Sequence, residues 1–332
     1  MPKYSVIVPV YNRPAEIREL LDSFCGQSFT DYELLIVEDG STLPSAETVA
    51  EYTAKLPVSY FTKPNEGPGP TRNFGASHAR GQWVIFLDSD CLLSEGYFHA
   101  IENYLELNPD VDAFGGPDAT HPSFSPIQKA IGYSMTSFFT TGGIRGGKKA
   151  SLEKFKPRSF NMGMKKEVFD QLGGFSSLRF GEDIDLSLRL ENSGYCSVPI
   201  PGAWVFHKRR ATLRQFYKQV YNSGMARIVL GQLHPRSLKA VHLMPVAFLV
   251  YHLILLTSTV WFVHLGGLLA LYPLLILADS LRATRQLSVA FLSIASAYVQ
   301  LTGYGLGFLH SFWRVHVRKK GPDFAFRHNF YQ

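Results

Sequence analysis

The sequence predicts an α/β domain with a mainly parallel sheet, followed by C-terminal transmembrane or membrane-associated helices. In the first part, short apolar runs alternate with amphipathic stretches, as in βαβ units. In the second part, two long runs lack any charged residue, at 240–278 and 286–313. The charges divide in the same way, because residues 1–206 hold 18 basic and 25 acidic groups whereas 207–332 hold 15 and 2.

The predicted domain organisation follows these patterns. We expect a catalytic domain over residues 1–235, two to three hydrophobic membrane segments over 236–315, and a basic tail over 316–332. The three cysteines are odd in number and lack metal-ligand spacing, and we find no signal peptide, so the globular part is expected in a reducing compartment. No nucleic-acid partner is expected.

The expected elements of the first part follow each other as strand and helix. The predicted strands are 4–10, 32–37, 58–61 and 83–87, and the predicted helices between them are 15–24, 46–55 and 70–80. The runs SVIVPV and WVIFL are apolar at successive positions, which is typical of strands covered on both faces. Such sheets bind ligands at the carboxyl ends of their strands, so the polar residues that follow each strand are the candidates for a site.

The uncharged runs are 39 and 28 residues long, and a membrane crossing needs about 20. The first run is interrupted at 264–267, which predicts a helical hairpin. Residues 207–240 carry eight Lys or Arg and no acid, so this flank is expected in the cytoplasm, and the aromatic and basic residues of 214–221 favour a helix at the membrane surface. A third crossing would place the basic residues 318–320 outside, so the number of spans is left open.

Carboxylates follow two of the predicted strands. Asp88 and Asp90 come directly after WVIFL, where two acids repel each other unless a cation or hydrogen-bond donors compensate. Mg²⁺ or Mn²⁺ would compensate and still leave positions for phosphate oxygens. Asp39 lies in a Asp-Gly-Ser sequence, which is also ordinary turn chemistry between a strand and a helix.

A second acidic group lies at the start of a helix expected to begin within residues 181–183. There Asp185 and Arg189 have the spacing of an ion pair on one helix face. Glu182 and Asp183 have two interpretations, as first-turn acids that stabilise the helix dipole or as catalytic carboxylates. We favour the catalytic interpretation because the pair follows a glycine-containing loop.

Six motifs in this order resemble glycosyltransferase family 2, over roughly residues 3–225. They are VIVPVYNRP, VEDGS, GPGPTRNFGASHARG, FLDSD, FNMGMKKEVFDQLGGF and GEDIDLSLRL. The resemblance implies a GT-A fold, an inverting reaction and a nucleotide-sugar donor, with either UDP or GDP. It also implies a divalent metal cofactor, Mn²⁺ or Mg²⁺, and a membrane-bound enzyme of cell-wall or polysaccharide biosynthesis whose partners are membrane lipids and a glycan or polyprenyl-linked acceptor.

The resemblance also implies roles for individual residues. Nucleotide-sugar binding is implied for Pro9, Tyr11, Asp39, Arg72 and Asp88. Metal binding is implied for Asp90, with Asp88 and His207 completing the site, although His207 beside three basic residues is equally typical of a solvated basic edge. Asp183 is implied to be the catalytic base, and Glu182 to orient the base or the acceptor.

Other interpretations stay open on the sequence alone. The glycines and basic residues of 142–158 predict either a solvated loop or a lid over an anionic ligand. The absence of a QxxRW motif disfavours a processive polymer synthase. A polyprenyl-phosphate sugar synthase is the nearest enzyme alternative, and a nucleotidyltransferase or a non-catalytic membrane-tethered nucleotide-sugar binding protein are alternatives of other classes.

Overall fold

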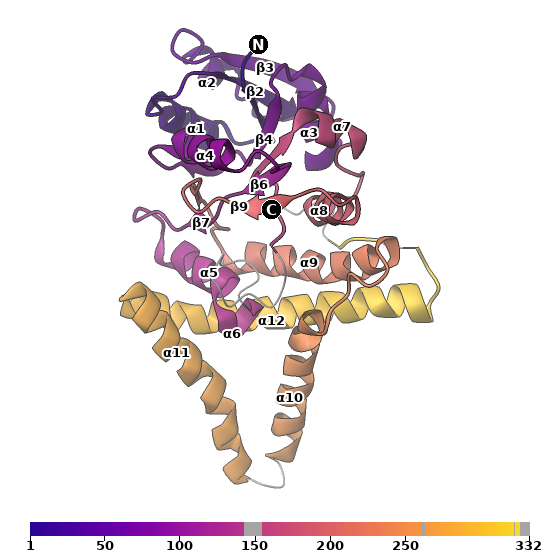
Figure 1. The fold of residues 1–332 in the computed structure, drawn as a ribbon. Helices are drawn as coiled ribbons and strands as arrows, with labels where there is room; N and C mark the ends of the chain where they lie inside the picture. The colour runs from indigo at the N-terminus through magenta and orange to yellow at the C-terminus, as the bar shows by residue number, and fades with distance from the viewer. Residues whose placement is uncertain (143–154, 260–262, 322, 326–332) are drawn as a thin grey trace. The chain divides into compact units, whose positions relative to one another are not determined.

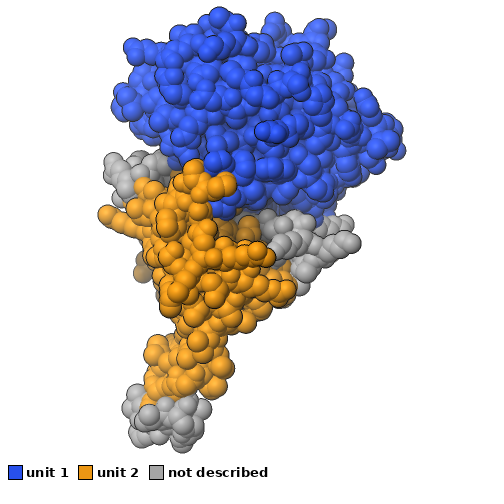
Figure 2. Space-filling model, turned by 90° about the vertical axis from the view of Figure 1, so that its left-hand side faces the viewer, with its two compact units in different colours: residues 1–121, 154–208 blue, residues 122–153, 209–332 orange. Residues whose placement is uncertain are grey.

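The computed structural model describes residues 1–142, 155–259, 263–321 and 323–325. Two compact units make up the chain (Figure 2). Unit 1 comprises residues 1–121 and 154–208, and unit 2 comprises 122–153 and 209–332. Each unit is therefore made of two separate segments of the chain. A catalytic domain over residues 1–235 stays a prediction.

Unit 1 is built on a sheet of seven strands in the order β3-β2-β1-β4-β8-β6-β9 (Figure 1). The strands are β1 (Tyr4–Val10), β2 (Tyr32–Asp39), β3 (Val58–Lys63), β4 (Trp83–Leu87), β6 (Ala113–Gly115), β8 (Asn161–Lys165) and β9 (Ser197–Pro199). The four strands from β1 to β4 are parallel, and β8 is antiparallel to both of its neighbours. The mainly parallel sheet predicted from the sequence is therefore confirmed.

Six helices surround this sheet among the described residues of unit 1. They are α1 (Pro14–Cys25), α2 (Ala46–Ala50), α3 (Pro68–His78), α4 (Tyr97–Leu107), α7 (Lys166–Gln171) and α8 (Glu182–Asn192). The helix expected over 46–55 is shorter, because the chain turns after Ala50. A second small sheet has the order β5-β10-β7, from Cys91–Leu93, Val205–His207 and Asp118–Ala119.

Both faces of the main sheet are buried, as its uninterrupted apolar runs predict. On β1, Val6 and Val8 belong to one apolar cluster and Ile7 to another. Helix α3 approaches β1 and β2 closely at Gly75, where an added Cβ would lie 2.5 Å from Ile7 Cγ2. This glycine lets α3 lie on the sheet and thereby positions the helix that carries Arg72.

Unit 2 is helical. It contains α5 (Pro126–Thr136), α6 (Phe138–Thr141), α9 (Leu213–Leu233), α10 (Met244–Ser258), α11 (Leu271–Thr284) and α12 (Leu287–Phe312), with short 3₁₀ or π segments at Ala240–Leu243, Val263–Ala270 and Trp313–Val317. Three stretches are long and apolar enough to cross a membrane, at Ala240–Ser258, Gly266–Thr284 and Leu287–Val317. The interruption predicted at 264–267 falls in the 3₁₀ segment between α10 and α11.

We predict that Gly75→Ala destabilises unit 1 by about 1–3 kcal/mol, because overpacking against Ile7 outweighs the better helix propensity of alanine. The measurement is the shift in thermal unfolding temperature of the detergent-purified protein. Gly26→Ala is the matched control, since its added Cβ would make only an ordinary contact, 3.6 Å from the carbonyl oxygen of Ser23. Equal unfolding temperatures for the two variants would contradict the close approach.

Candidate active site

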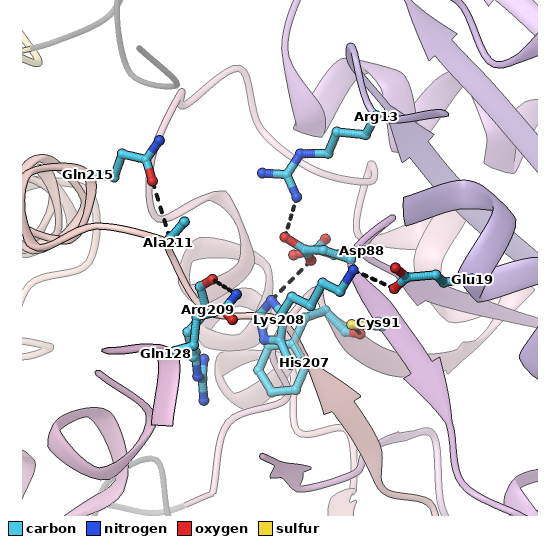
Figure 3. Close-up of polar contacts among 12 residues, drawn as sticks. Arg13, Glu19, Asp88, Cys91, Gln128, His207, Lys208, Arg209, Ala211 and Gln215 are labelled. Atoms are coloured by element: carbon cyan, nitrogen blue, oxygen red, sulfur yellow. Dashed lines mark hydrogen bonds and ion pairs between the residues drawn. The ribbon is translucent and has the colours of Figure 1, made fainter. Parts of the chain in front are cut away.

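Asp90 lies in the turn between β4 and β5 and is held by Arg13 and His207, whose side chains are labelled in Figure 3. Its carboxylate forms an ion pair with Arg13, which follows β1. On the other oxygen, Oδ1, it lies 3.2 Å from His207 Nε2. The backbone N–H of Lys208 donates to the Asp90 carbonyl at 2.9 Å. Asp90 is therefore fixed at the carboxyl ends of β1 and β4, where the sequence predicted a site.

His207 reaches Asp90 because β10 pairs with β5. This antiparallel pairing sets His207 opposite Cys91, and the imidazole stacks on Phe160 with 4.8 Å between ring centroids. Ligand atoms of Asp90, Cys91 and His207 lie within 4.8 Å of one another. A carboxylate oxygen and an imidazole nitrogen suit Mn²⁺. The Cys91 thiol instead donates to the Phe160 carbonyl at 3.5 Å.

Arg72 joins the two acidic motifs. Its Nη2 donates to Asp88 Oδ1 at 2.6 Å and its Nη1 donates to Glu182 Oε1 at 3.0 Å. The guanidinium is almost fully buried and lies 5.3 Å from the centre of the Phe175 ring. Burial disfavours its charge, yet the carboxylates of Asp88 and Glu182 raise the pKa of Arg72 above its ordinary value. Arg72 thus stays charged and holds residues 94 positions apart in the chain.

Glu182 is the first residue of α8 and is 7% exposed. Burial and the neighbouring charge of Asp183 raise the pKa of Glu182 to about 7, against the opposing effect of Arg72. Arg72 compensates only in part, because its guanidinium is shared with Asp88. A carboxyl that titrates near neutrality inside such a charged cluster is typical of functional sites.

Asp183 is the second residue of α8, as predicted for a helix that begins at this point. The backbone of Gly181 before it has φ of 84°, which an L-residue rarely adopts and glycine does freely. Asp183 Oδ2 lies 3.0 Å from Arg158 Nε, and its Oδ1 accepts from the Ile184 N–H at 2.8 Å. The expected ion pair between Asp185 and Arg189 is also present, at 2.8 Å.

Asp39 ends β2 and is buried. Its oxygens accept the backbone N–H groups of Glu66 and Gly67, both at 2.9 Å, and Lys63 Nζ lies 3.1 Å away. The carboxylate therefore fixes the loop that leads into α3 and Arg72.

The other two residues implied for the nucleotide belong to the first strand end. Pro9 is on β1 and Tyr11 follows it, both half-buried. The structure thus places every predicted site residue at the carboxyl ends of β1, β2 and β4 or on α3, α8 and β10. Asp88 pairs with Arg72 and is not in the group formed by Asp90, Cys91 and His207.

Three residues of this site were not singled out as site residues from the sequence. Arg13 lies within the VYNRP motif after β1, so its place in that motif was the available signal. Cys91 carries no such signal, because only the pairing of β5 with β10 brings it to His207. Arg158 lies at the end of the cationic stretch 142–158, of which residues 143–154 fall outside the described part of the chain.

Comparison with known proteins identifies the family. The family model described as glycosyl transferase family 2 matches residues 5–173, about half of the chain. An uncharacterized glycosyltransferase of Haemophilus influenzae is 31% identical over 192 residues, which cover 56% of this chain and 61% of that protein. The poly(ribitol-phosphate) beta-N-acetylglucosaminyltransferase TarS of Staphylococcus aureus is 43% identical over 94 residues, 27% of this chain and 16% of TarS. The chain thus spans less than two thirds of these relatives.

Solved structures share the fold. The mannosyltransferase PcManGT of Pyrobaculum calidifontis, in complex with GDP-Man and Mn²⁺, matches with a TM-score of 0.62 and 19% identity, over 90% of this chain and 87% of that one. Residues 1–349 of S. aureus TarS, in complex with UDP-GlcNAc, match with a TM-score of 0.50 and 19% identity, over 96% and 92% of the two chains. The expected GT-A fold is confirmed, and with the family model covering half of its length, the chain belongs to glycosyltransferase family 2.

Proposed function

We propose that this protein transfers a sugar, with inversion and with the help of a divalent metal, from a nucleoside-diphosphate sugar to a hydroxyl of a lipid-linked or cell-surface glycan precursor. The observation that carries this proposal is the bridge made by Arg72. It joins Asp88, beside the candidate metal ligand Asp90, to Glu182, beside the candidate base Asp183. One site therefore holds groups for the leaving diphosphate and for the acceptor hydroxyl.

The metal would be held by Asp90 and His207, whose oxygen and nitrogen ligands fit Mn²⁺. When bound, the metal supplies positive charge that stabilises the leaving nucleoside diphosphate. The Arg13 guanidinium already contacts Asp90 and is a second source of positive charge there. Pro9, Tyr11, Asp39 and Arg72 form the nucleotide side of the proposed site, with Asp39 acting through the loop that it fixes.

Asp183 is the proposed base. As the acceptor oxygen bonds to the anomeric carbon, the bond from that carbon to the diphosphate breaks, and the hydroxyl proton passes to the Asp183 carboxylate. Attack opposite the leaving group inverts the anomeric centre. Arg158 Nε lies 3.0 Å from Asp183 Oδ2, and an opposite charge at this distance favours the ionised form of a carboxyl.

The relatives and the apolar helices support the proposed acceptor class. TarS is named for transfer to poly(ribitol-phosphate), and the 36% identical GgaB of Bacillus subtilis for minor teichoic acid biosynthesis. The three apolar helices are consistent with a location at the cytoplasmic membrane, with the catalytic unit in the cytoplasm, where the basic flank 207–240 is expected. Transfer to a polyprenyl phosphate is the second candidate, because the same location serves both acceptors.

We expect Mn²⁺- or Mg²⁺-dependent release of the nucleoside diphosphate from one member of a panel of UDP-, GDP- and dTDP-sugars, measured in mild detergent with and without membrane lipid extract. Asp90→Ala should abolish this release and also weaken binding of Mn²⁺ alone, measured by electron paramagnetic resonance. Asp170→Asn, at an exposed site on α7, is the control. Release of pyrophosphate from a nucleoside triphosphate would instead identify a nucleotidyltransferase.

Asp183→Asn is expected to lower the rate of transfer about 10²- to 10⁴-fold, because the amide cannot accept the acceptor proton. Donor binding, measured by calorimetry, should stay within a few fold of the natural protein. The same Asp170→Asn variant again serves as the control. Unchanged transfer by Asp183→Asn would exclude Asp183 as the base.

We predict that Glu182 makes the free energy of unfolding fall as pH rises from about 4.5 to about 7. In this window the folded protein keeps the Glu182 proton that the unfolded chain loses, so each pH unit costs up to about 1.4 kcal/mol. Glu182→Gln removes this contribution. The gain in thermal unfolding temperature of Glu182→Gln over the natural protein should therefore be larger at pH 8 than at pH 5, and a gain independent of pH would contradict the raised pKa.

A further inference from the structure

The helix α12 has the length and composition of a membrane span. Its side chains, however, are buried by protein at its centre and exposed toward its ends, which is not the pattern of a helix that crosses lipid. Its central residues 296–305 include none that is exposed. The exposed apolar side chains lie toward its two ends instead, with Leu287 and Phe291 both 57% exposed at the start and Trp313 53% exposed just after the end. A helix that crosses a bilayer has its centre in the hydrocarbon and its ends at the headgroups.

The centre of α12 is covered by helices of the same unit. Helix α9 packs on it backbone to backbone, since a Cβ added to Gly307 would lie 2.0 Å from the Tyr221 carbonyl oxygen and one added to Gly224 would lie 2.1 Å from the Tyr304 carbonyl oxygen. Ser296 on α12 donates to the Ala130 carbonyl of α5 at 2.9 Å. Such contacts leave no room for lipid between α12 and these two helices.

The two covering helices are poorly suited to the membrane interior. Helix α9 carries Arg214, Lys218 and Arg227 within its 21 residues, and α5 has only 11 residues. Each Lys or Arg at the centre of a crossing helix costs about 2.5–3.5 kcal/mol. Neither is among the candidate spans found in the described residues. Because α12 is inseparable from α9, a crossing by α12 would carry these charges into the bilayer.

The helices α10 and α11 differ from α12. In their most apolar windows, 17% and 11% of the residues are buried, against 44% for α12. Both contact α12, where the His252 ring of α10 bonds the Tyr298 hydroxyl at 3.1 Å and Ser280 of α11 donates to Ser293 at 2.8 Å. Both then run away from α12 on one side of it (Figure 1). They have the form of a membrane hairpin.

We propose that α10 and α11 are the only spans among the described helices and that α12 lies in the plane of the membrane surface, with the apolar side chains at its ends in contact with lipid. The cationic side chains that flank α12 then lie on the same side of the bilayer. Exposed Arg282 and Arg285 precede α12, and exposed Arg318, Lys319 and Lys320 follow it. An in-plane α12 places both groups at anionic headgroups, whereas a third crossing would separate them.

One labelling experiment tests both the proposed membrane location and this inference, and its outcomes distinguish the two. Single cysteines would be introduced at Leu287, Phe291, Leu306, Leu309 and Trp313 of the full chain, with Cys25→Ser and Cys196→Ser, and spin-labelled in vesicles of phosphatidylcholine and phosphatidylglycerol. Oxygen and nickel accessibilities then give the depth of each label. Labels at Val250, Leu253 and Leu256 on α10 are the matched control for a crossing helix.

We expect one shallow depth for the four labels on α12 and the label at position 313, and a steep depth gradient along α10. A crossing α12 would spread its labels over about 39 Å, at about 1.5 Å per residue for 26 residues, and that gradient would overturn the inference. Water-like accessibility at all α12 labels with a gradient on α10 would equally overturn the lipid contact. Water-like accessibility on α10 as well would refute the membrane location itself.

A reporter at the C-terminus requires no substitution in the helices. With two spans, a green fluorescent protein fused after Gln332 should fluoresce and an alkaline phosphatase fused there should be inactive, because the C-terminus shares the side of the N-terminus. The reverse pair of results would show an odd number of crossings and overturn the proposal.

Discussion

Unit 1 depends on one buried guanidinium. Arg72 lies between two acids, the buried Glu182 and the partly exposed Asp88, and it stays charged because both are within hydrogen-bond distance. Its own position is set by α3, whose approach to the sheet needs Gly75 and whose leading loop is fixed by Asp39. Removal of Arg72 would therefore leave Asp88 and Glu182 without the cation that they share, so the fold and the proposed site depend on the same residue.

Acidic and basic side chains alternate in the site. Arg13 and His207 flank Asp90, Arg72 lies between Asp88 and Glu182, and Arg158 contacts Asp183. This arrangement allows a folded site that holds several carboxylates before any substrate is bound, since each acid has a cation beside it. It also means that a diphosphate entering the site would meet basic groups already in position, which lowers the cost of rearrangement on binding.

Most of the fold of unit 1 could be predicted from the sequence because its strands are uninterrupted apolar runs with polar residues directly after them. The acids at positions 39, 88 and 90 were found in the same way, and Asp183 was found in the acidic pair at the start of a predicted helix. Cys91 and Arg158 were not identified, because their place in the site comes from pairing between distant segments rather than from a local pattern. The sequence also did not predict that unit 2 is built from two separate segments, because α5 gives no local sign that it packs on a helix more than 150 residues later.

That arrangement has a practical consequence for how the protein can be divided. A fragment ending at residue 235 would keep α5 and α9 but lose α12, which packs against both. The apolar cluster of Ile131, Met135, Phe216 and Val220 would lose its contact with Val299, and the glycine-lined backbone of α9 would face water. The apolar C-terminal third is thus part of the core for helices that precede it in the chain, and removing it to gain solubility would expose the surface that causes aggregation.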